Sequence, residues 1–240
     1  MFDTAFYVIV LGCLLAAIVN AAFATGGVYI MLLASSSVLP ISHAIPLQSV
    51  FAVGSLTGRL YYFWKYIDWP LFRAFVLGSL VGVFLGTQAF VSVPEKALFV
   101  MLGITLLVLI WAPRIPWRLP LKQPFFLVGI VHSFLGALLG VGGILQPLVL
   151  RTKLTKFQVT GTLAACMFTL DIMKAIGYIS VGFDYLQYIP HIVGATLAGF
   201  AGTYIGKSLT HRVSEDLFRT VFKLLVSIAA IRFIAKGLSL

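Results

Sequence analysis

The sequence predicts an all-α polytopic membrane protein built from two homologous repeats of inverted topology. Of its 240 residues, 60% are hydrophobic and 10% are charged, and the mean hydropathy is +1.05. A soluble domain carries about 25% charged residues, so a chain this apolar cannot cover its surface with polar groups. Long apolar runs recur from end to end, which distinguishes the chain from a β-barrel of short alternating strands.

The apolar runs give the expected membrane segments in order. A helix of about 20 apolar residues spans a bilayer. Short polar or proline-containing gaps separate the runs, and the gap at residues 66–70 places aromatic side chains at an expected membrane interface. The runs lie at residues 4–33, 43–64, 70–92, 97–112, 124–150, 157–181, 186–206 and 217–235.

The second half of the chain repeats the first at an offset of 116 residues (142 minus 26). At this offset a glycine pair, an aspartate and a Gly-Thr pair recur in the same order, and such internal repeats are typical of secondary transporters. We expect a first repeat at 1–112, a basic cytoplasmic linker at 113–123 and a second repeat at 124–240. The matched positions include Gly26-Gly27 with Gly142-Gly143, Asp68 with Asp184, and Gly86-Thr87 with Gly202-Thr203.

Each repeat opens with a long apolar run that contains its glycine pair. Glycine disfavours a helix interior, and Pro147 reinforces a break in the second copy. A broken helix at membrane depth persists only where it is buried or lines a cavity. The alternative is that the small residues allow two helices to pack closely. We favour a re-entrant broken helix plus three transmembrane helices in each repeat.

The charges support this topology. If every run crossed once, the basic gaps at 113–123 and 151–156 would lie on opposite faces, against the positive-inside rule. If both broken runs re-enter, these gaps share the cytoplasmic face. Each repeat then crosses an odd number of times, so the two repeats are inverted. We therefore expect a multi-pass protein of the cytoplasmic membrane with its N- and C-termini outside.

The charged residues Arg59, Asp171 and Lys174, which lie within apolar runs, are candidates for function. Intramembrane charges are costly and commonly mark a substrate or ion path. Asp171 and Lys174 share one helix face, so they form either a local ion pair or part of a coupling or charge relay. Arg59 has no acidic neighbour at helical spacing, and it either extends to the interface or lines an anion path.

Uncharged polar groups near the glycine pairs are the expected substrate-binding residues. Amides and hydroxyls coordinate an anion without the desolvation cost of a full charge, and helix N-termini add N–H donors. The alternative role for each is to bond neighbouring helices. Asn20 also flanks the first glycine pair. Together with Arg59, the substrate-binding candidates are Gly26, Gly27, Gln48, Ser49, Gly142, Gly143, Gln146, Thr160 and Thr162.

The remaining motifs exclude several classes of protein. The four histidines have no metal-binding spacing, so we expect no metal and no cofactor. His132 or His191 could carry a coupling proton, and the alternative is a structural histidine between helices. No nucleophile triad or P-loop is present, which argues against an enzyme. The net charge of +10 is spread over the gaps, which argues against nucleic-acid binding.

The second glycine motif carries a family resemblance. The run from Gly136 to Leu148, GALLGVGGILQPL, resembles the signature of the TauE/SafE sulfite exporter family, in which a leucine-rich run precedes a glycine cluster and then Pro and Leu. The signature recurs in both halves of that family's chains. Here the first copy, NAAFATGG at residues 20–27, lacks the first glycine and the proline.

This resemblance implies transport of a small sulfur-containing or organic anion, such as sulfite or sulfoacetate, coupled to protons. Alternating access would then move one repeat against the other around the two broken helices. An anion channel of the same fold, without coupling, is the alternative. Membrane lipids are the other expected partner, and the composition is also compatible with a homo-oligomer.

Overall fold

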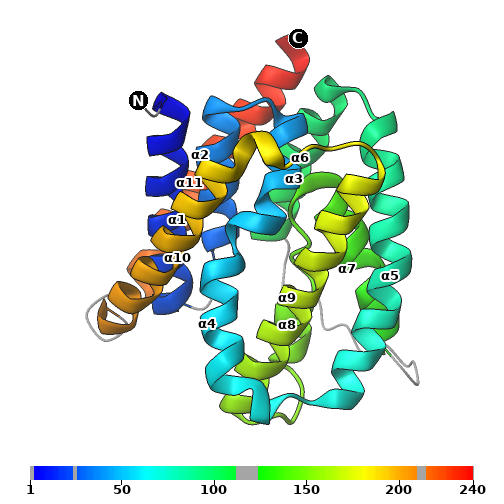
Figure 1. Ribbon diagram of the computed structural model, residues 1–240, viewed down its shortest axis with the longest axis vertical. Coiled ribbons are helices and arrows are strands. Elements are labelled where there is room, and N and C mark those ends of the chain that lie inside the picture. Colours follow the sequence, from blue (N-terminus) through cyan, green and yellow to red (C-terminus); the bar gives the residue numbers. More distant parts are fainter. Residues whose placement is uncertain (1–2, 24–25, 112–123, 210–214, 240) are drawn as a thin grey trace.

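The computed structural model describes residues 3–23, 26–111, 124–209 and 215–239. Within these ranges every regular element is a helix (Figure 1). The sequence-based assignment to an all-α class with several apolar helices is thereby confirmed. The expected basic linker at 113–123 lies outside the described residues.

The helices follow the predicted apolar runs closely. The two runs that contain a glycine pair each form two helices. The run at 43–64 was predicted to be one helix and instead forms two, which meet at Ala52. The first half contains α1 (Thr4–Phe23), α2 (Gly27–Val38), α3 (Ile41–Phe51), α4 (Val53–Phe63), the short 3-10 helix η1 (Trp64–Tyr66), α5 (Trp69–Ser92) and α6 (Glu95–Trp111). The second half contains α7 (Pro124–Leu139), α8 (Leu145–Val149), α9 (Lys156–Ser180), the 3-10 helix η2 (Leu186–Tyr188), α10 (Ile189–Leu209) and α11 (Glu215–Ser239).

Glycines with positive φ lie where the first helix of each half ends. Gly26 has φ of 98° immediately before α2, and Gly140 and Gly143 have φ of 77° and 68° between α7 and α8. Side chains other than glycine rarely adopt this left-handed region. After each of these points the chain turns back, so that α2 runs beside α1 and α8 follows α7 (Figure 1).

Two long helices begin at side-chain caps. The Asp68 carboxylate accepts the Leu71 amide at 2.9 Å, and Pro70 lies in the first turn of α5. Thr155 and Gln158 form a reciprocal capping box at the start of α9. Each cap satisfies amide groups that the first helical turn leaves unpaired, and so fixes where the helix begins.

The helices of the two halves pack reciprocally. Helix α1, the first of the first half, contacts α10 of the second half, and α7, the first of the second half, contacts α5 of the first. Helices α4 and α9 also contact each other, as do α6 and α11. Gly86 and Gly202 make the close approaches possible, because an added Cβ would meet the Phe134 carbonyl or the Leu14 carbonyl. Small residues bring helix backbones together in the same way in membrane proteins generally.

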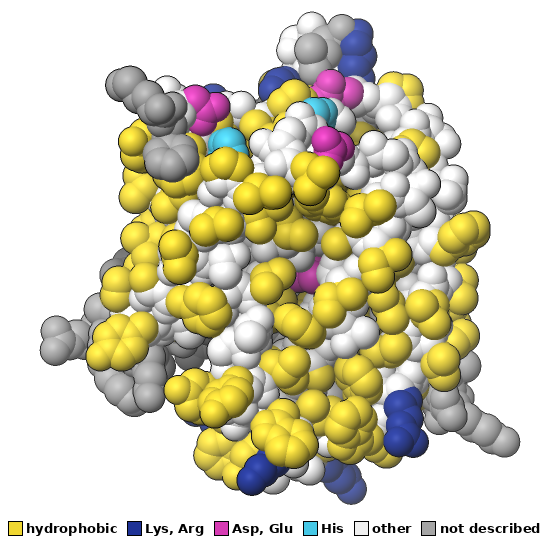
Figure 2. Space-filling view, in the orientation of Figure 1, with side chains coloured by type: hydrophobic (Ala, Val, Ile, Leu, Met, Phe, Trp, Pro, Cys, Tyr) yellow, Lys and Arg dark blue, Asp and Glu magenta, His cyan; other side chains and the backbone are white. Residues whose placement is uncertain are grey.

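The surface is apolar over most of its height. Figure 2 shows hydrophobic side chains across the visible face, with charged side chains near its two ends. Three described helices are long and apolar enough to cross a membrane, namely Thr4–Ala22, Trp69–Ser92 and Lys156–Ser180. Phe84 and Leu197 are 63% and 65% exposed, which would be unfavourable in water and is favourable against lipid.

The two ends of the molecule carry different charges. The described chain ends, near Thr4 and Ser239, lie at one end, called here the termini end (Figure 1). On the visible face, acidic side chains gather at the termini end, and only Lys and Arg side chains mark the opposite end (Figure 2). Lys65 and Lys156 belong to that opposite end, where η1 contacts the start of α9.

Candidate functional site

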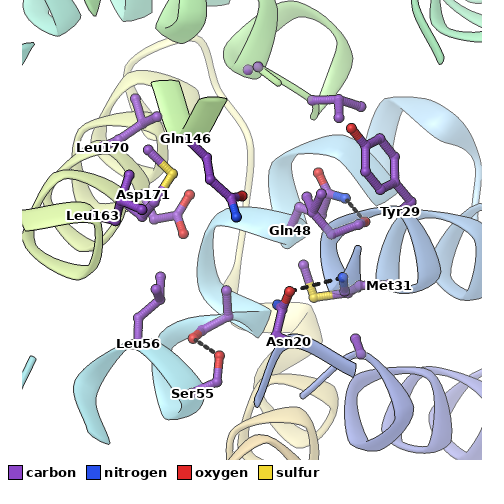
Figure 3. A pocket seen from close by; sticks show the side chains of 18 of the residues that line it. Asn20, Tyr29, Met31, Gln48, Ser55, Leu56, Gln146, Leu163, Leu170 and Asp171 are labelled. Carbon is purple, nitrogen blue, oxygen red and sulfur yellow. Dashed lines mark hydrogen bonds between the residues drawn. The ribbon is translucent and has the colours of Figure 1, made fainter. Parts of the chain in front are cut away.

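A cavity of about 480 Å³ lies between the two halves of the chain, and glycines from the α1–α2 and α7–α8 junctions line it. Its lining comes from α1 to α4 of the first half and from α7 to α9 of the second, with further contributions from α6 and α10. Figure 3 shows Asn20, Gln48, Gln146 and Asp171 arranged around one space, which apolar side chains such as Met31 and Leu170 also line. The site therefore combines an apolar wall with a few polar groups, as small-ligand pockets commonly do.

In the first half, Asn20 holds the start of α2. Its side-chain oxygen accepts the Gly27 amide N–H at 3.0 Å (Figure 3). A Cβ at Gly27 would overlap the Ala16 carbonyl and the Asn20 side chain, so only glycine fits against α1 at this point. The sequence placed Asn20 among the polar candidates beside the glycine pairs, and the structure shows that it lines the cavity and holds the first amide of α2.

In the second half, His132 plays the corresponding part for α8. Its Nδ1 accepts the amide N–H groups of Ile144 and Leu145, each at 3.2 Å. An acceptor nitrogen carries no proton, so these bonds select the neutral ring with its proton on Nε2. A Cβ at Gly142 would overlap the imidazole ring. A proton relay through His132 would have to use Nε2 or break both bonds.

Gln48 presents an acceptor without a partner. Its Nε2 donates to the Val28 carbonyl at 3.0 Å, and this bond fixes the orientation of the amide, since two oxygens would repel each other (Figure 3). The amide oxygen lies beside Gly140, and it is buried without a hydrogen-bond partner among the described residues. A buried acceptor without a partner is unfavourable, which makes Gln48 available to a ligand or to water.

Arg59 presents a donor without a partner. It lies on α4 and lines the cavity, and its Nη2 atom is buried with no hydrogen-bond partner among the described residues. Ser55 lines the same cavity one turn earlier and donates to the Ala52 carbonyl at 3.1 Å. A guanidinium donates to two oxygens of an anion at once, so Arg59 is suited to an oxyanion.

Asp171 and Lys174 form the ion pair that the sequence allowed. Lys174 Nζ lies 3.4 Å from Asp171 Oδ1, and the side chains are 5% and 16% exposed. Both residues line the cavity from α9. With Arg59, the cavity therefore has two cationic side chains and one carboxylate, a formal excess of one positive charge (2 minus 1).

Most of the predicted candidates line this cavity, and four do not. His191 lies outside it, with its Nε2 3.5 Å from Asp3 Oδ1. Thr162 lies in the interior and accepts the Asp68 amide at 2.9 Å, near the start of α5. Thr160 donates to the Lys156 carbonyl of its own helix. Ser49 is buried against the Pro46 carbonyl and Tyr185. Lining the cavity are Gly26, Gly27, Gln48, Arg59, His132, Gly142, Gly143, Gln146, Asp171 and Lys174.

Tyr29 and Ser55 line the cavity and were missed by sequence reasoning. Tyr29 follows the glycine pair by two residues, and its ring contacts Phe222 with centroids 5.6 Å apart. Its position in the first turn of α2 could have predicted this, because that turn lies next to the glycine pair that lines the same cavity. Ser55 carried no comparable signal, since hydroxyls within apolar runs are common.

At the termini end, a segment between α9 and α10 is bonded to α3. Tyr188 and His43 are joined by a hydrogen bond of 2.5 Å, and Tyr185 Oη donates to the Pro46 carbonyl at 3.2 Å. The rings of Phe183 and Tyr188 are stacked beside His43. Burial raises the pKa of the Tyr185 phenol above its ordinary value, which keeps the hydroxyl protonated as a donor.

The site offers no metal centre within the described ranges. No group of three or more His, Cys, Asp or Glu side chains lies close enough there to hold an ion. Cys13 and Cys166 are free and buried.

The fold and the cavity define a helical membrane protein with a polar site enclosed by both halves of the chain. The chain belongs to the TauE/SafE sulfite exporter family, whose model matches residues 9–233. This confirms the resemblance read from the second glycine motif and places the chain in a family of membrane transporters. Comparison with curated proteins and with solved structures gave no match.

Proposed function

We propose that the protein is a secondary transporter that moves a small sulfur-containing or organic anion, such as sulfite or sulfoacetate, across the cytoplasmic membrane. The observation that carries this proposal is the buried, unpartnered Nη2 of Arg59 in a cavity between two interrupted helices. The family provides independent support for transport of a sulfur oxyanion. The one-charge excess in the cavity favours an anion over a neutral or cationic solute.

In this proposal the anion lies between the starts of α2 and α8. Helix N-termini favour negative charge, and α2 begins beside the cavity at Gly26 and Gly27, where Asn20 holds the Gly27 amide. Arg59 attracts the anion from α4, and Lys174 does so from α9. Gln48, Gln146 and the glycines Gly142 and Gly143 complete the substrate contacts.

We propose that proton coupling uses the Asp171–Lys174 pair. An anion that approaches Lys174 competes with the carboxylate 3.4 Å away. A proton on Asp171 would cancel its charge and release Lys174 to the anion, so anion and proton would bind together. Anion binding that favours the protonated form of Asp171 would couple movement of the anion to movement of a proton.

Alternating access would use the inverted repeats. The reciprocal contacts of α1 with α10 and of α5 with α7 support a two-fold relation between residues 1–112 and 124–240. Each half also bonds to the other near an end, through Tyr185 with Pro46 and through Asp68 with Thr162. If only one of these two contacts were broken at a time, the cavity would open to only one side of the membrane at a time. The N- and C-termini would face outward.

The test is flux in proteoliposomes containing the purified protein. We expect uptake of labelled sulfite or sulfoacetate that exceeds protein-free vesicles, and an imposed pH gradient should change its rate. Thermal unfolding with a panel of sulfur oxyanions and carboxylates identifies the ligand, since binding to the native state stabilises it. No flux of any oxyanion would contradict the proposal. Flux at channel rates with no effect of the pH gradient would identify the alternative, an anion channel.

A further inference from the structure

A second cavity, of about 460 Å³, lies outside the substrate site, in a groove between α2 and α11. Leu33 and Ser36 line it from α2. Leu225, Ile228, Arg232 and Lys236 line it from α11. The groove is apolar along its length and cationic near the end of α11, so its two parts suit different portions of one amphipathic ligand.

The groove has a closed and an open end. The Tyr29 and Phe222 rings, in contact at 5.6 Å, join α2 to α11 on the side away from the termini end. Leu225 and Lys236 are eleven positions apart on α11, or about 16 Å at the rise of an α-helix. That length matches about half the thickness of a bilayer's hydrocarbon core, which is the depth of one leaflet.

The charges at the open end have no acidic partner within the described ranges. Arg232 and Lys236 are exposed and lie one turn apart on α11. The ion pairs found among the described residues involve neither of them. Lys236 Nζ lies 4.5 Å from the centroid of the Phe99 ring, a contact that leaves its charge uncompensated. Two free cations one turn apart at a membrane interface attract an anionic lipid headgroup.

We propose that this groove binds an anionic glycerophospholipid of the leaflet at the termini end. An acyl chain lies along Leu33, Leu225 and Ile228, and the phosphodiester lies between Arg232 and Lys236. A second copy of the chain fits less well, because a two-fold contact here would bring these cations against their own counterparts. The site is separate from the proposed transport site and shares only the Tyr29–Phe222 contact with its wall.

The experiment compares lipids on the purified full-length protein in detergent. Phosphatidylglycerol in large excess should raise the thermal unfolding midpoint by about 5 °C, and phosphatidylcholine should raise it much less. The R232A/K236A variant should bind phosphatidylglycerol about thirtyfold more weakly, since each cation near a membrane surface contributes about 1 kcal/mol. The matched control is K65A/R73A, which removes two exposed cations at the opposite end and should keep the full shift.

A second variant separates headgroup from chain binding. I228W fills the groove and should reduce the number of lipids retained in native mass spectrometry, with the cations intact. Equal stabilisation by both headgroups, or a full shift in R232A/K236A, would overturn the proposal. It would also be overturned if inorganic phosphate alone raised the unfolding midpoint as much as phosphatidylglycerol does. The same holds if phosphatidylglycerol caused the protein to self-associate, the R232A/K236A variant did not, and this association explained the rise in the midpoint.

Discussion

Arg59 is the residue whose setting is hardest to explain without a ligand. Its Nη2 is buried with no hydrogen-bond partner among the described residues, and the residue lines the cavity. We expect Arg59→Gln to raise the apparent Km for the transported anion about 10- to 150-fold, because a charge-assisted hydrogen bond contributes about 1.5–3 kcal/mol. Flux measured across a range of anion concentrations gives this value.

Lys65 provides the control for this substitution. It is an exposed cation in η1, two turns beyond Arg59 in the chain, and Lys65→Gln removes the same charge without touching the cavity. If both variants raise Km equally, Arg59 acts through the general surface potential and not through contact with the anion.

The Asp171–Lys174 pair allows a stability prediction. Removing one member of a buried pair leaves the other charge uncompensated, at a cost of about 3–5 kcal/mol. We therefore expect Asp171→Asn to lower the unfolding midpoint strongly, and D171N/K174M to recover most of the loss. Thermal unfolding in detergent measures both variants. A double variant as unstable as the single one would show that the pair is not coupled in this way.

The sequence predicted which charged residues line the cavity better than it predicted which hydroxyl groups do. Arg59, Asp171 and Lys174 were found because charge within an apolar run is rare, and all three line the cavity. Ser49 and Thr162 were placed near the site by their position after the broken runs. Their hydroxyls instead bond Tyr185 and the Asp68 amide, because helix rotation decides which face a side chain joins. Sequence spacing alone does not give that rotation.

Among the elements, the start of α2 depends most on one residue. Gly26 has φ of 98°, and a Cβ there would lie 3.0 Å from the Phe222 ring. We expect Gly26→Ala to destabilise the protein by about 1–2 kcal/mol, the cost of the left-handed conformation for a residue with a Cβ. The unfolding midpoint of the purified variant measures it.

Gly58 is the matched control for Gly26. It lies within α4 with ordinary φ, and an added Cβ would meet nothing within 4 Å. Gly58→Ala should therefore stabilise the helix by about 0.5–1 kcal/mol. If the two substitutions shift the midpoint in the same direction, the conformation of Gly26 is not what limits the stability of this region.

Element boundaries were predictable except where the cause lay in another helix. The long runs became helices that end within a few residues of the expected positions. The division of 43–64 at Ala52 was missed, although Pro46 and Gly54 lie on either side of it. A Cβ at Gly54 would overlap the Thr196 carbonyl of α10, so α4 is held there by a partner nearly 150 residues away in the chain. A local pattern contains no information about such a contact.

For the whole molecule, the inverted arrangement predicts where two equivalent residues lie. Ser37 and Lys153 are related by the repeat offset (37 plus 116), and both are exposed. In an inverted pair of repeats they lie on opposite sides of the membrane. We expect a membrane-impermeant maleimide added to intact cells to label Ser37→Cys and to label Lys153→Cys only after permeabilisation.

This labelling requires a background without other reactive thiols. Cys13 and Cys166 are both buried and can be replaced by Ala for the purpose. Labelling of both positions from one side would contradict the inverted arrangement. Ser37 is a better probe than the neighbouring Ser36, which is 5% exposed and donates to the Leu32 carbonyl.

The reciprocal packing of the two halves has a consequence for synthesis. Helices α1 and α5 have their main partners, α10 and α7, in the half of the chain that the ribosome makes second. We therefore expect the first half to enter the bilayer with the small-residue faces of α1 and α5 in contact with lipid. These faces gain their helical partners when α7, and then α10, has been synthesised. We therefore expect neither half to fold when it is expressed alone. Two fragments divided between the halves should assemble only when both are produced in the same cell.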